Sequence, residues 1–469
     1  MLRASSIIRP IVSSVKSVRT LSTSSVLLAQ PRQKEGKAKQ ILKKNSQVIR
    51  EKPKKTTSLT HLRFGDAVRV LGFETTAPAL NVDTLTLTTE KNTITKFDKS
   101  MEDKLTVFDA FKKYQHHEMF QNPVTLVTSN TERIVDQFVN NLDKESKDNR
   151  KYIDGIKGSG KSTLITQTIS LANEKFENDI VVLHLHNADL VGNGSSDYIR
   201  NNKLQVYQQP MLTKRWIKKI LKNNESIFKK LKLTKDTKFV NKKKEEVELK
   251  AGENTLFEYL NQNHDMSKTS PTFAFQFFIE QLIEHSETTP VLLSIDNFNA
   301  FADFPLTKYR HPDFTPVHIE EFELGKFIIQ AASGELSFKK GGVLLAKSGD
   351  YAANRQTVQV GVYPNQEFNP YAKLPLLDYS ISQKLASNGG ITPFQVEPLT
   401  KEEVKSLMTF WKDQGVLIVR DDFHKKEFNE EKTYKESNPE EQFERLFESL
   451  YVANQGNPYG MIKQAVLAY

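Results

Sequence analysis

The part of the chain that most restricts its possible folds is the stretch KYIDGIKGSGKSTLITQTISLA, residues 151–172. Its GIKGSGKS core has the spacing G-x-x-x-x-G-K-[ST], in which glycines let backbone N–H groups turn inward around phosphate oxygens. We expect Lys161 to reach the terminal phosphates, Ser162 to ligate Mg²⁺, and the following helix to point its positive end at the anion. The sequence therefore predicts a nucleotide site in a P-loop α/β fold. Its binding residues are the loop positions Gly155, Ile156, Lys157, Gly158, Ser159, Gly160, Lys161, Ser162 and Thr163.

A second apolar run supplies the acid that such a loop needs for the water shell of its metal. VLLSIDNF, residues 291–298, is typical of a strand buried on both faces, and Asp296 follows it. Ser162 and Asp296 are therefore the expected Mg²⁺ ligands. Asn297 comes next, where ATPases of this broad class commonly carry a glutamate that polarises the attacking water. Because an amide cannot accept a proton, we expect a site that holds a nucleotide more than it hydrolyses it, and we assign no catalytic residue.

Strands and helices alternate along the middle of the chain. Further apolar strands are expected at 179–190 and 341–351, with a helix at about 320–333 between them. This alternation predicts a doubly wound parallel sheet with helices on both faces. Lys347 and Ser348 fall at the carboxyl edge, where nucleotides bind in such sheets, so either could face the γ-phosphate.

A possible metal pattern, H-x-H-x-x-D, is formed by His184, His186 and Asp189. Residues i and i+2 of a strand share a face, so the two imidazoles could converge on a metal. The interpretation that we favour is two hydrogen-bonded histidines beside a covering helix, because further ligands are missing nearby. The sequence contains no N-K-x-D, the motif by which Ras-like GTPases read guanine, so these residues leave guanine and adenine open.

Charge is unevenly distributed along the chain. Residues 1–63 hold 15 Lys and Arg against two acids, and residues 214–250 hold 14 against five. Since the net charge is +9, the rest of the chain sums to −13. Basic segments on an acidic body usually contact phosphate polymers such as RNA, although a solvated charge run is the alternative. The absence of cysteine excludes disulfides, thiolate metal sites and cysteine nucleophiles. We also expect no membrane span.

The N-terminal stretch, MLRASSIIRPIVSSVKSVRTLSTSSVLLAQ, is rich in arginine and serine and has no acid before Glu35. These features are typical of a mitochondrial transit peptide, with a disordered basic tail as the alternative. We therefore expect a transit peptide over residues 1–28 and a location in the mitochondrial matrix.

Three further regions are expected. A basic extension over 29–120 includes an exposed strand pair in 84–97 and an amphipathic helix in 107–120. A P-loop domain over 121–375 includes a helix at 131–142 capped by Ser129 or Asn130. The Lys-rich insert 214–250 starts with an amphipathic helix around Trp216, and its later part is expected to loop out.

A smaller helical or winged-helix-like domain is expected over 376–469. Its first helix begins at the Thr400/Glu403 capping box and ends at Gly415. Its next elements are a strand at 416–419, a helix opened by Asn438–Pro439, and a last helix started by a Gly-Asn-Pro turn.

Taken in order, these residues resemble the death-associated protein 3 family, GTP-binding proteins of the mitochondrial small ribosomal subunit. The resemblance rests on GIKGSGKS, HLHNADL, QQPMLTKRWIKKIL, SIDNFNAF with PLTKY, GGVLLAKSGDY and GNPYGM, from about residue 150 to 469. It does not extend residue by residue to the first 150 residues or to the insert. It implies a fold like that of AAA+ and STAND ATPases.

The resemblance also implies GTP or GDP, with ATP possible, and Mg²⁺ at Gly155–Thr163 and Asp296. The expected partners are small-subunit rRNA and neighbouring ribosomal proteins, without homo-oligomers. The function that it implies is a structural ribosomal component that supports mitochondrial translation. The alternative is a matrix AAA-like ATPase or GTPase that acts on a protein or RNA substrate.

Overall fold

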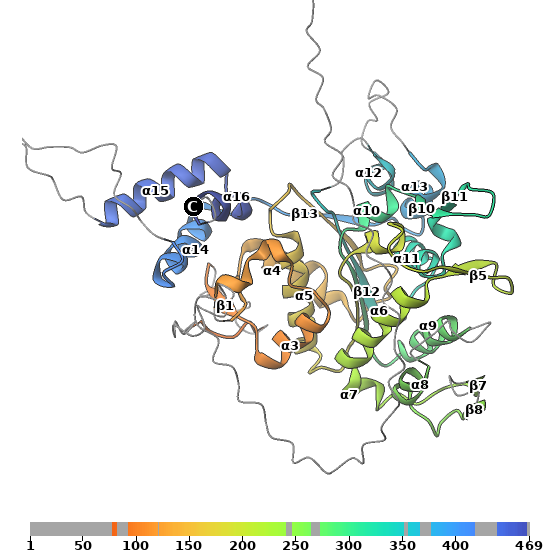
Figure 1. The fold of residues 1–469 in the computed structure, drawn as a ribbon. Helices are drawn as coiled ribbons and strands as arrows, with labels where there is room; N and C mark the ends of the chain where they lie inside the picture. The colour runs from red at the N-terminus through yellow and green to blue at the C-terminus, as the bar shows by residue number, and fades with distance from the viewer. Residues whose placement is uncertain are drawn as a thin grey trace, which may run out of the picture. The chain divides into compact units, whose positions relative to one another are not determined.

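A five-stranded parallel sheet forms the centre of the fold. The computed structural model describes residues 77–81, 92–120, 122–240, 246–263, 273–350, 355–365, 377–417 and 439–466. The strand order is β13-β3-β12-β9-β4. The bounds are β3 (Arg150–Asp154), β4 (Val181–Leu185), β9 (Val291–Ile295), β12 (Gly341–Ala346) and β13 (Thr392–Gln395). The prediction of an α/β fold with a parallel sheet is confirmed (Figure 1).

The three strands β4, β9 and β12 are apolar because both of their faces are covered. Every one of their residues is buried. Figure 1 shows α5 (Lys161–Lys175) and α11 (Glu323–Ser333) on opposite sides of β12. Parallel pairing aligns the strand ends, with Leu185 opposite Ile295 and Leu345 opposite both Ile295 and Tyr152. The residues that follow β3, β9 and β12 therefore meet at one edge of the sheet.

Further helices and hairpins complete the layers around the sheet. The helices are α3 (Lys99–Val107), α4 (Ser129–Gln137), α6 (Pro210–Asn223), α7 (Glu225–Phe228), α8 (Leu256–Gln262), α9 (Ala274–His285), α10 (Phe298–Ala302), α12 (Thr357–Val362) and α13 (Tyr379–Ala386). The antiparallel pairs are β1 (Ile94–Lys96) with β2 (Val124–Leu126), β5 (Ile199–Asn201) with β6 (Val206–Gln208), β7 (Thr237–Val240) with β8 (Glu246–Leu249), and β10 (Leu306–Arg310) with β11 (Pro316–His318). Within the described ranges, no helix is long and apolar enough to cross a bilayer.

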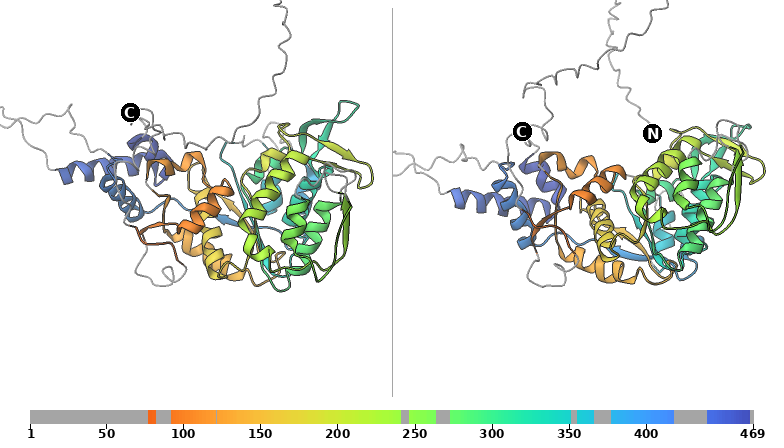
Figure 2. Two further views of the ribbon diagram at one scale, coloured as in Figure 1. Left: turned by 60° about the horizontal axis from the view of Figure 1, so that its bottom comes forward. Right: turned by 90° about the horizontal axis from the view of Figure 1, so that it is seen from below.

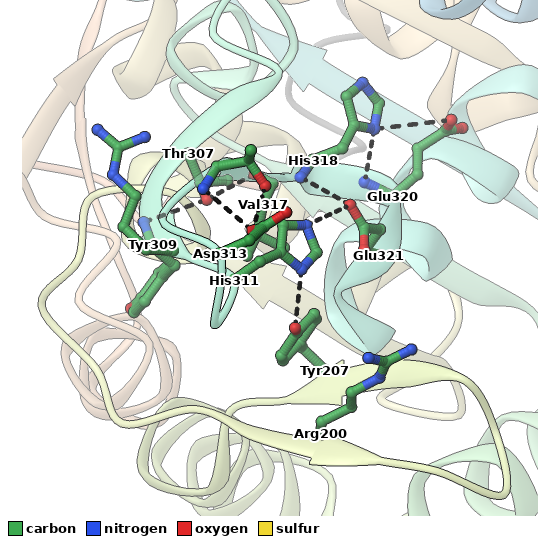
Figure 3. Close-up of polar contacts among 12 residues, drawn as sticks. Arg200, Tyr207, Thr307, Tyr309, His311, Asp313, Val317, His318, Glu320 and Glu321 are labelled. Carbon is green, nitrogen blue, oxygen red and sulfur yellow. Dashed lines mark hydrogen bonds and ion pairs between the residues drawn. The ribbon is translucent and has the colours of Figure 1, made fainter.

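Polar contacts fasten the β10–β11 hairpin to its neighbours (Figure 3). His311 bonds through Nδ1 to the Tyr207 hydroxyl of β6 at 2.9 Å and through Nε2 to Glu321 at 3.2 Å. The same Glu321 carboxylate accepts the backbone N–H of His318 at 3.1 Å. These contacts hold the hairpin against β6 and the 3₁₀ turn Ile319–Glu321 that precedes α11.

The amphipathic helix expected at 107–120 is wrong. Helix α3 ends at Val107, and two 3₁₀ turns follow at Lys113–Gln115 and His117–Met119. The apolar side chains of this stretch have the spacing of a helix, but they bury in three different places. Phe108 packs on His184, and Phe111 packs on Phe97. Phe120 packs on Phe410 of a C-terminal helix. No single helix face could reach all three sites.

Two neighbouring expectations have different outcomes. The N-cap of α4 is Thr128, whose side chain accepts the Thr131 N–H, because Asn130 instead bonds the backbone of Glu397. Of the strand pair expected in 84–97, β1 is present and pairs with β2; residues 82–91 lie outside the described residues, so the pair itself stays a prediction. The extension 29–120 as a domain stays a prediction. Its described residues Leu105 and Phe108 are buried in the main core.

The Lys-rich insert begins with the expected amphipathic helix. On α6, Trp216, Ile217 and Ile220 are buried, whereas Arg215 and Lys218 are exposed. The later part of the insert forms regular secondary structure instead of the expected loop. It forms α7 and the β7–β8 hairpin, with the aromatic ring of Phe239 against that of Tyr259 on α8 (5.9 Å between centroids).

The C-terminal helices are α14 (Lys401–Asp413), α15 (Pro439–Asn454) and α16 (Pro458–Ala465). The capping box of Thr400 and Glu403, the stop at Gly415 and the start at Asn457 are confirmed. Val416 and Leu417 form no strand, and residues 418–438 lie outside the described residues. The domain boundary near 376 stays a prediction. Strand β13 comes after this boundary in the sequence but pairs with β3 of the central sheet. Figure 2 shows the orange segment that carries α3 and α4 beside these blue helices.

Candidate functional site

The glycine loop, residues 155–162, follows β3 at the carboxyl edge of the sheet and includes the first two residues of α5. Gly158 and Gly160 have φ angles of +84° and +93°, which favour glycine. A Cβ at Gly158 would lie 2.5 Å from Cβ of Tyr459, so α16 approaches the loop too closely for any side chain there. A Cβ at Gly160 would meet nothing within 4 Å, so the loop is open on that side.

Lys161 lies inside the loop rather than on the surface. Its side-chain ammonium donates to the carbonyls of Gly155 (2.8 Å) and Ile156 (2.6 Å), and the residue is only 6 % exposed. Burial lowers the pKa of Lys161 to about 8. A desolvated cation whose only hydrogen-bond acceptors are neutral carbonyls interacts much more favourably with an anionic ligand than with those carbonyls.

Two further features of the loop suit an anion. Among the described residues, the Ser159 hydroxyl is buried with no hydrogen-bond partner. The first N–H groups of α5 have no partners within the helix and carry its positive dipole. The residues present therefore fit a phosphate group. Lys161, Ser162 and Thr163 form the first turn of α5, and Lys157 at the rim forms an ion pair with Asp350.

The two expected metal ligands are in contact. The Ser162 hydroxyl donates to Asp296 Oδ2 at 2.8 Å, and Asp296 is 2 % exposed. A hydroxyl and a buried carboxylate are oxygen ligands of the kind that Mg²⁺ takes beside nucleotide phosphates. Asp296 Oδ2 has a second neighbour, the ammonium of Lys112 at 3.1 Å.

Asn297 adopts a left-handed conformation (φ 58°) at the start of α10. Its side-chain amide donates to Asn187 Oδ1 at 3.1 Å. Asn297 also lines a cavity beside the glycine loop. An amide held in this way can orient a neighbour but cannot remove a proton from water.

Lys347 and Ser348 also line that cavity. Lys347 forms an ion pair with Asp154 Oδ1 at 2.8 Å, and the other oxygen of Asp154 accepts from the Tyr363 hydroxyl at 3.1 Å. The Ser348 backbone exchanges two hydrogen bonds with the Asn299 side chain. Contact of either residue with a γ-phosphate stays a prediction.

The histidine pattern brings no metal ligands together. His184 is buried and bonds the Ser294 hydroxyl at 2.7 Å, whereas Asp189 accepts from Asn193 at 3.1 Å. Burial lowers the pKa of His186 to about 4. In the part of the chain that the structure describes, no group of three or more His, Asp or Glu side chains is placed to hold a metal.

A cavity of about 360 Å³ lies between the glycine loop, the segment before α4 and the C-terminal helices. Its polar end is the glycine loop. Away from the phosphate end, its wall is mostly apolar, formed by Ile94, Val124, Leu126, Val396, Leu399, Leu407, Trp411 and Ile462. An apolar wall beside a phosphate cradle suits a flat ring such as a nucleotide base.

Sequence reasoning missed three residues that contact the candidate site. Lys112 contacts Asp296, and Gln115 donates to the Thr163 hydroxyl at 3.2 Å. Asn457 donates to the carbonyl of Lys157 at 2.8 Å. GNPYGM was a usable signal for Asn457, but nothing in the KKYQHH stretch distinguishes Lys112 from its neighbours.

The comparisons with known proteins agree on one family. The family model described as "Mitochondrial ribosomal death-associated protein 3" matches residues 125–464, more than half of the chain. The "Small ribosomal subunit protein mS29" of Schizosaccharomyces pombe is 24 % identical over 333 residues, 70 % of this chain and 66 % of that protein. The protein of the same name from Neurospora crassa is 21 % identical over 388 residues, 77 % of this chain and 75 % of that protein. The chain therefore belongs to the mitochondrial ribosomal death-associated protein 3 family.

Proposed function

We propose that this chain is a structural component of the mitochondrial small ribosomal subunit that holds a nucleotide through its P-loop, residues 155–163. The observation that carries the proposal is the desolvated Lys161 ammonium inside an open loop, beside the orphaned Ser159 hydroxyl. Both groups gain a partner when a phosphate enters, so the loop has more to gain from an anion than from water.

In this proposal, the loop N–H groups, Lys161 and the N-terminus of α5 bind the phosphates. Ser162 and Asp296 hold Mg²⁺, which would offset the charge of the terminal phosphates. The ligand is GTP or GDP, with ATP possible, and its base lies along the apolar wall. A bound nucleotide is also what the resemblance to the family implies. The choice between guanine and adenine follows from the resemblance rather than from a side chain of the site.

Turnover is slow in this proposal, because Asn297 stands where a base would act. The loss of general-base catalysis is worth about 10²–10⁴-fold in rate. The nucleotide then braces the loop against α5 and α16 and does not drive a cycle of motion.

The ribosomal part of the proposal is supported by the printed names of the two relatives and by the charge distribution. We infer that rRNA contacts the cationic segments, including exposed Arg215, Lys218 and Lys222 on α6, and that neighbouring ribosomal proteins contact the body. The protein would work in the mitochondrial matrix. The proposed transit peptide, residues 1–28, lies outside the described residues.

Nucleotide content tests the site. Wild-type protein purified without added nucleotide is denatured, and the released small molecules are separated by anion-exchange chromatography. We expect a guanine nucleotide at close to one equivalent in the wild type and none in Lys161→Ala. Unchanged nucleotide in Lys161→Ala would refute the assignment of the loop.

Salt-dependent RNA binding tests the basic segments. Deleting residues 31–60, or replacing Lys242, Lys243 and Lys244 with glutamine, changes positions outside the described residues. Each variant should bind small-subunit rRNA more weakly and keep its nucleotide. Each lost phosphate contact should flatten the plot of log affinity against log salt by about 0.7–0.9. An unchanged slope in both variants would assign RNA contact to other parts of the surface.

A further inference from the structure

Lys112 places a positive charge beside the expected metal position. It lies between α3 and the 3₁₀ turn Lys113–Gln115, about 180 residues before Asp296 in the sequence. Its ammonium is 3.1 Å from Asp296 Oδ2, and it also donates to the backbone carbonyl of His186. Asp296 Oδ2 is the same oxygen that accepts from Ser162. Asp296 Oδ2 therefore accepts a hydrogen bond from the Ser162 hydroxyl, which is expected to bind the metal, and also forms an ion pair with Lys112.

The environment makes this contact more than a surface ion pair. Asp296 is 2 % exposed, and the side chain of Lys112 is 22 % exposed. A carboxylate at such depth needs a compensating charge, because burying it alone costs several kcal/mol. Lys112 supplies that charge from within the chain.

The backbone around Lys112 is anchored on both sides. Phe108, four residues earlier, is buried in the core against the His184 ring. Gln115, three residues later, donates to the Thr163 hydroxyl on the first turn of α5 and accepts the backbone N–H of Lys112 at 2.9 Å. The segment is thus tied to β4 through Phe108 and to the first turn of α5 through Gln115.

We propose that Lys112 is a substitute cation for the metal at Asp296, so that the nucleotide is retained with little dependence on Mg²⁺. This inference rests on the proposed nucleotide site. When Mg²⁺ is absent, Lys112 keeps Asp296 neutralised, and the carboxylate does not repel the incoming phosphates. When Mg²⁺ is present, metal and lysine share one task, and loss of either is tolerated.

The test is a two-by-two comparison of GDP affinity, measured by isothermal titration calorimetry on nucleotide-stripped full-length protein. Wild type and Lys112→Met are each titrated in Mg²⁺ and in EDTA. We expect wild-type affinity to change by less than about threefold between the two buffers, and Lys112→Met to lose tenfold or more in EDTA only. Lys112→Arg should behave as the wild type, because it keeps the charge.

Lys113→Met is the matched control, because Lys113 is the exposed neighbour on the same turn. It should match the wild type in both buffers, and melting curves check that every variant is folded. A wild type that loses GDP in EDTA as strongly as Lys112→Met would overturn the inference and leave the proposed function intact. Equal loss in both buffers for Lys112→Met would also overturn it, because that result assigns Lys112 a purely structural role. A wild type that binds no nucleotide in either buffer would overturn the inference and the proposed function together.

Discussion

Replacing Lys161 with methionine is expected to stabilise the nucleotide-free protein at pH 7 while abolishing nucleotide binding. The pKa of Lys161 falls from 10.5 to about 8 because the ammonium is buried. At 1.36 kcal/mol per pKa unit, keeping this lysine charged costs the folded state about 3 kcal/mol at pH 7. Methionine removes that cost at similar volume.

Two hydrogen bonds offset part of the gain. Lys161 donates to the carbonyls of Gly155 and Ile156, and each bond is worth about 1 kcal/mol. The net effect of Lys161→Met at pH 7 is therefore a stabilisation of about 1 kcal/mol.

The effect should change sign with pH. A lysine whose pKa is lowered in the folded state destabilises it below that pKa, and the penalty disappears as the pH rises toward 10.5. At pH 10 the penalty has shrunk to about 1 kcal/mol, which is less than the two lost hydrogen bonds. Lys161→Met should then be the less stable protein by about 1 kcal/mol.

Urea denaturation of nucleotide-stripped wild type and variant at pH 7 and pH 10 measures both differences. The wild type at each pH is the reference, so titration of other groups cancels in the comparison. A Lys161→Met protein that is destabilised equally at the two pH values would refute the argument that the ammonium is desolvated in the empty loop.

The remaining predictions concern the same site. Because bound phosphate keeps Lys161 charged, wild-type GDP affinity should fall about tenfold between pH 7 and pH 9, and the affinity of Lys161→Arg should stay constant. Asn297→Glu should raise GTP hydrolysis, measured as phosphate release, if the attacking water is already in place; brisk hydrolysis by the wild type would instead favour a motor enzyme. Gly158→Ala should destabilise the protein in urea by about 1–3 kcal/mol more than Gly160→Ala, because both variants strain a backbone of positive φ but only the Cβ at 158 would clash with Tyr459. Equal losses in the two glycine variants would contradict the close approach of α16.

The parts of the fold that could be predicted are those in which local pattern and burial agree. The GIKGSGKS spacing fixes a strand, a tight loop and a helix within twenty residues, and VLLSI is apolar enough to be a strand covered on both faces. Parallel strands then bring their carboxyl ends to one edge, which is why Ser162 and Asp296 meet although 134 residues separate them.

The parts that could not be predicted depend on contacts between distant segments. The stretch 107–120 has the apolar spacing of a helix, but Phe108, Phe111 and Phe120 each bury against a different partner, so the chain breaks into turns. Lys112 reaches Asp296 only because those turns bring it there, and no local sequence signal indicates that contact. The later part of the Lys-rich insert also differs from the expected loop, because the few apolar residues that pack it, such as Phe239 against Tyr259, are scattered among charged residues.

Sedimentation of the native protein tests the central claim most directly. A mitochondrial lysate is separated on a sucrose gradient, and each fraction is assayed for this chain, for small-subunit rRNA and for guanine nucleotide. The account predicts that all three peak together at low salt, and that the chain leaves the rRNA peak with its nucleotide as the salt concentration rises. A chain that sediments apart from the rRNA at low salt would contradict the ribosomal role. A chain that comigrates with the rRNA without any nucleotide would contradict the proposed use of the glycine loop.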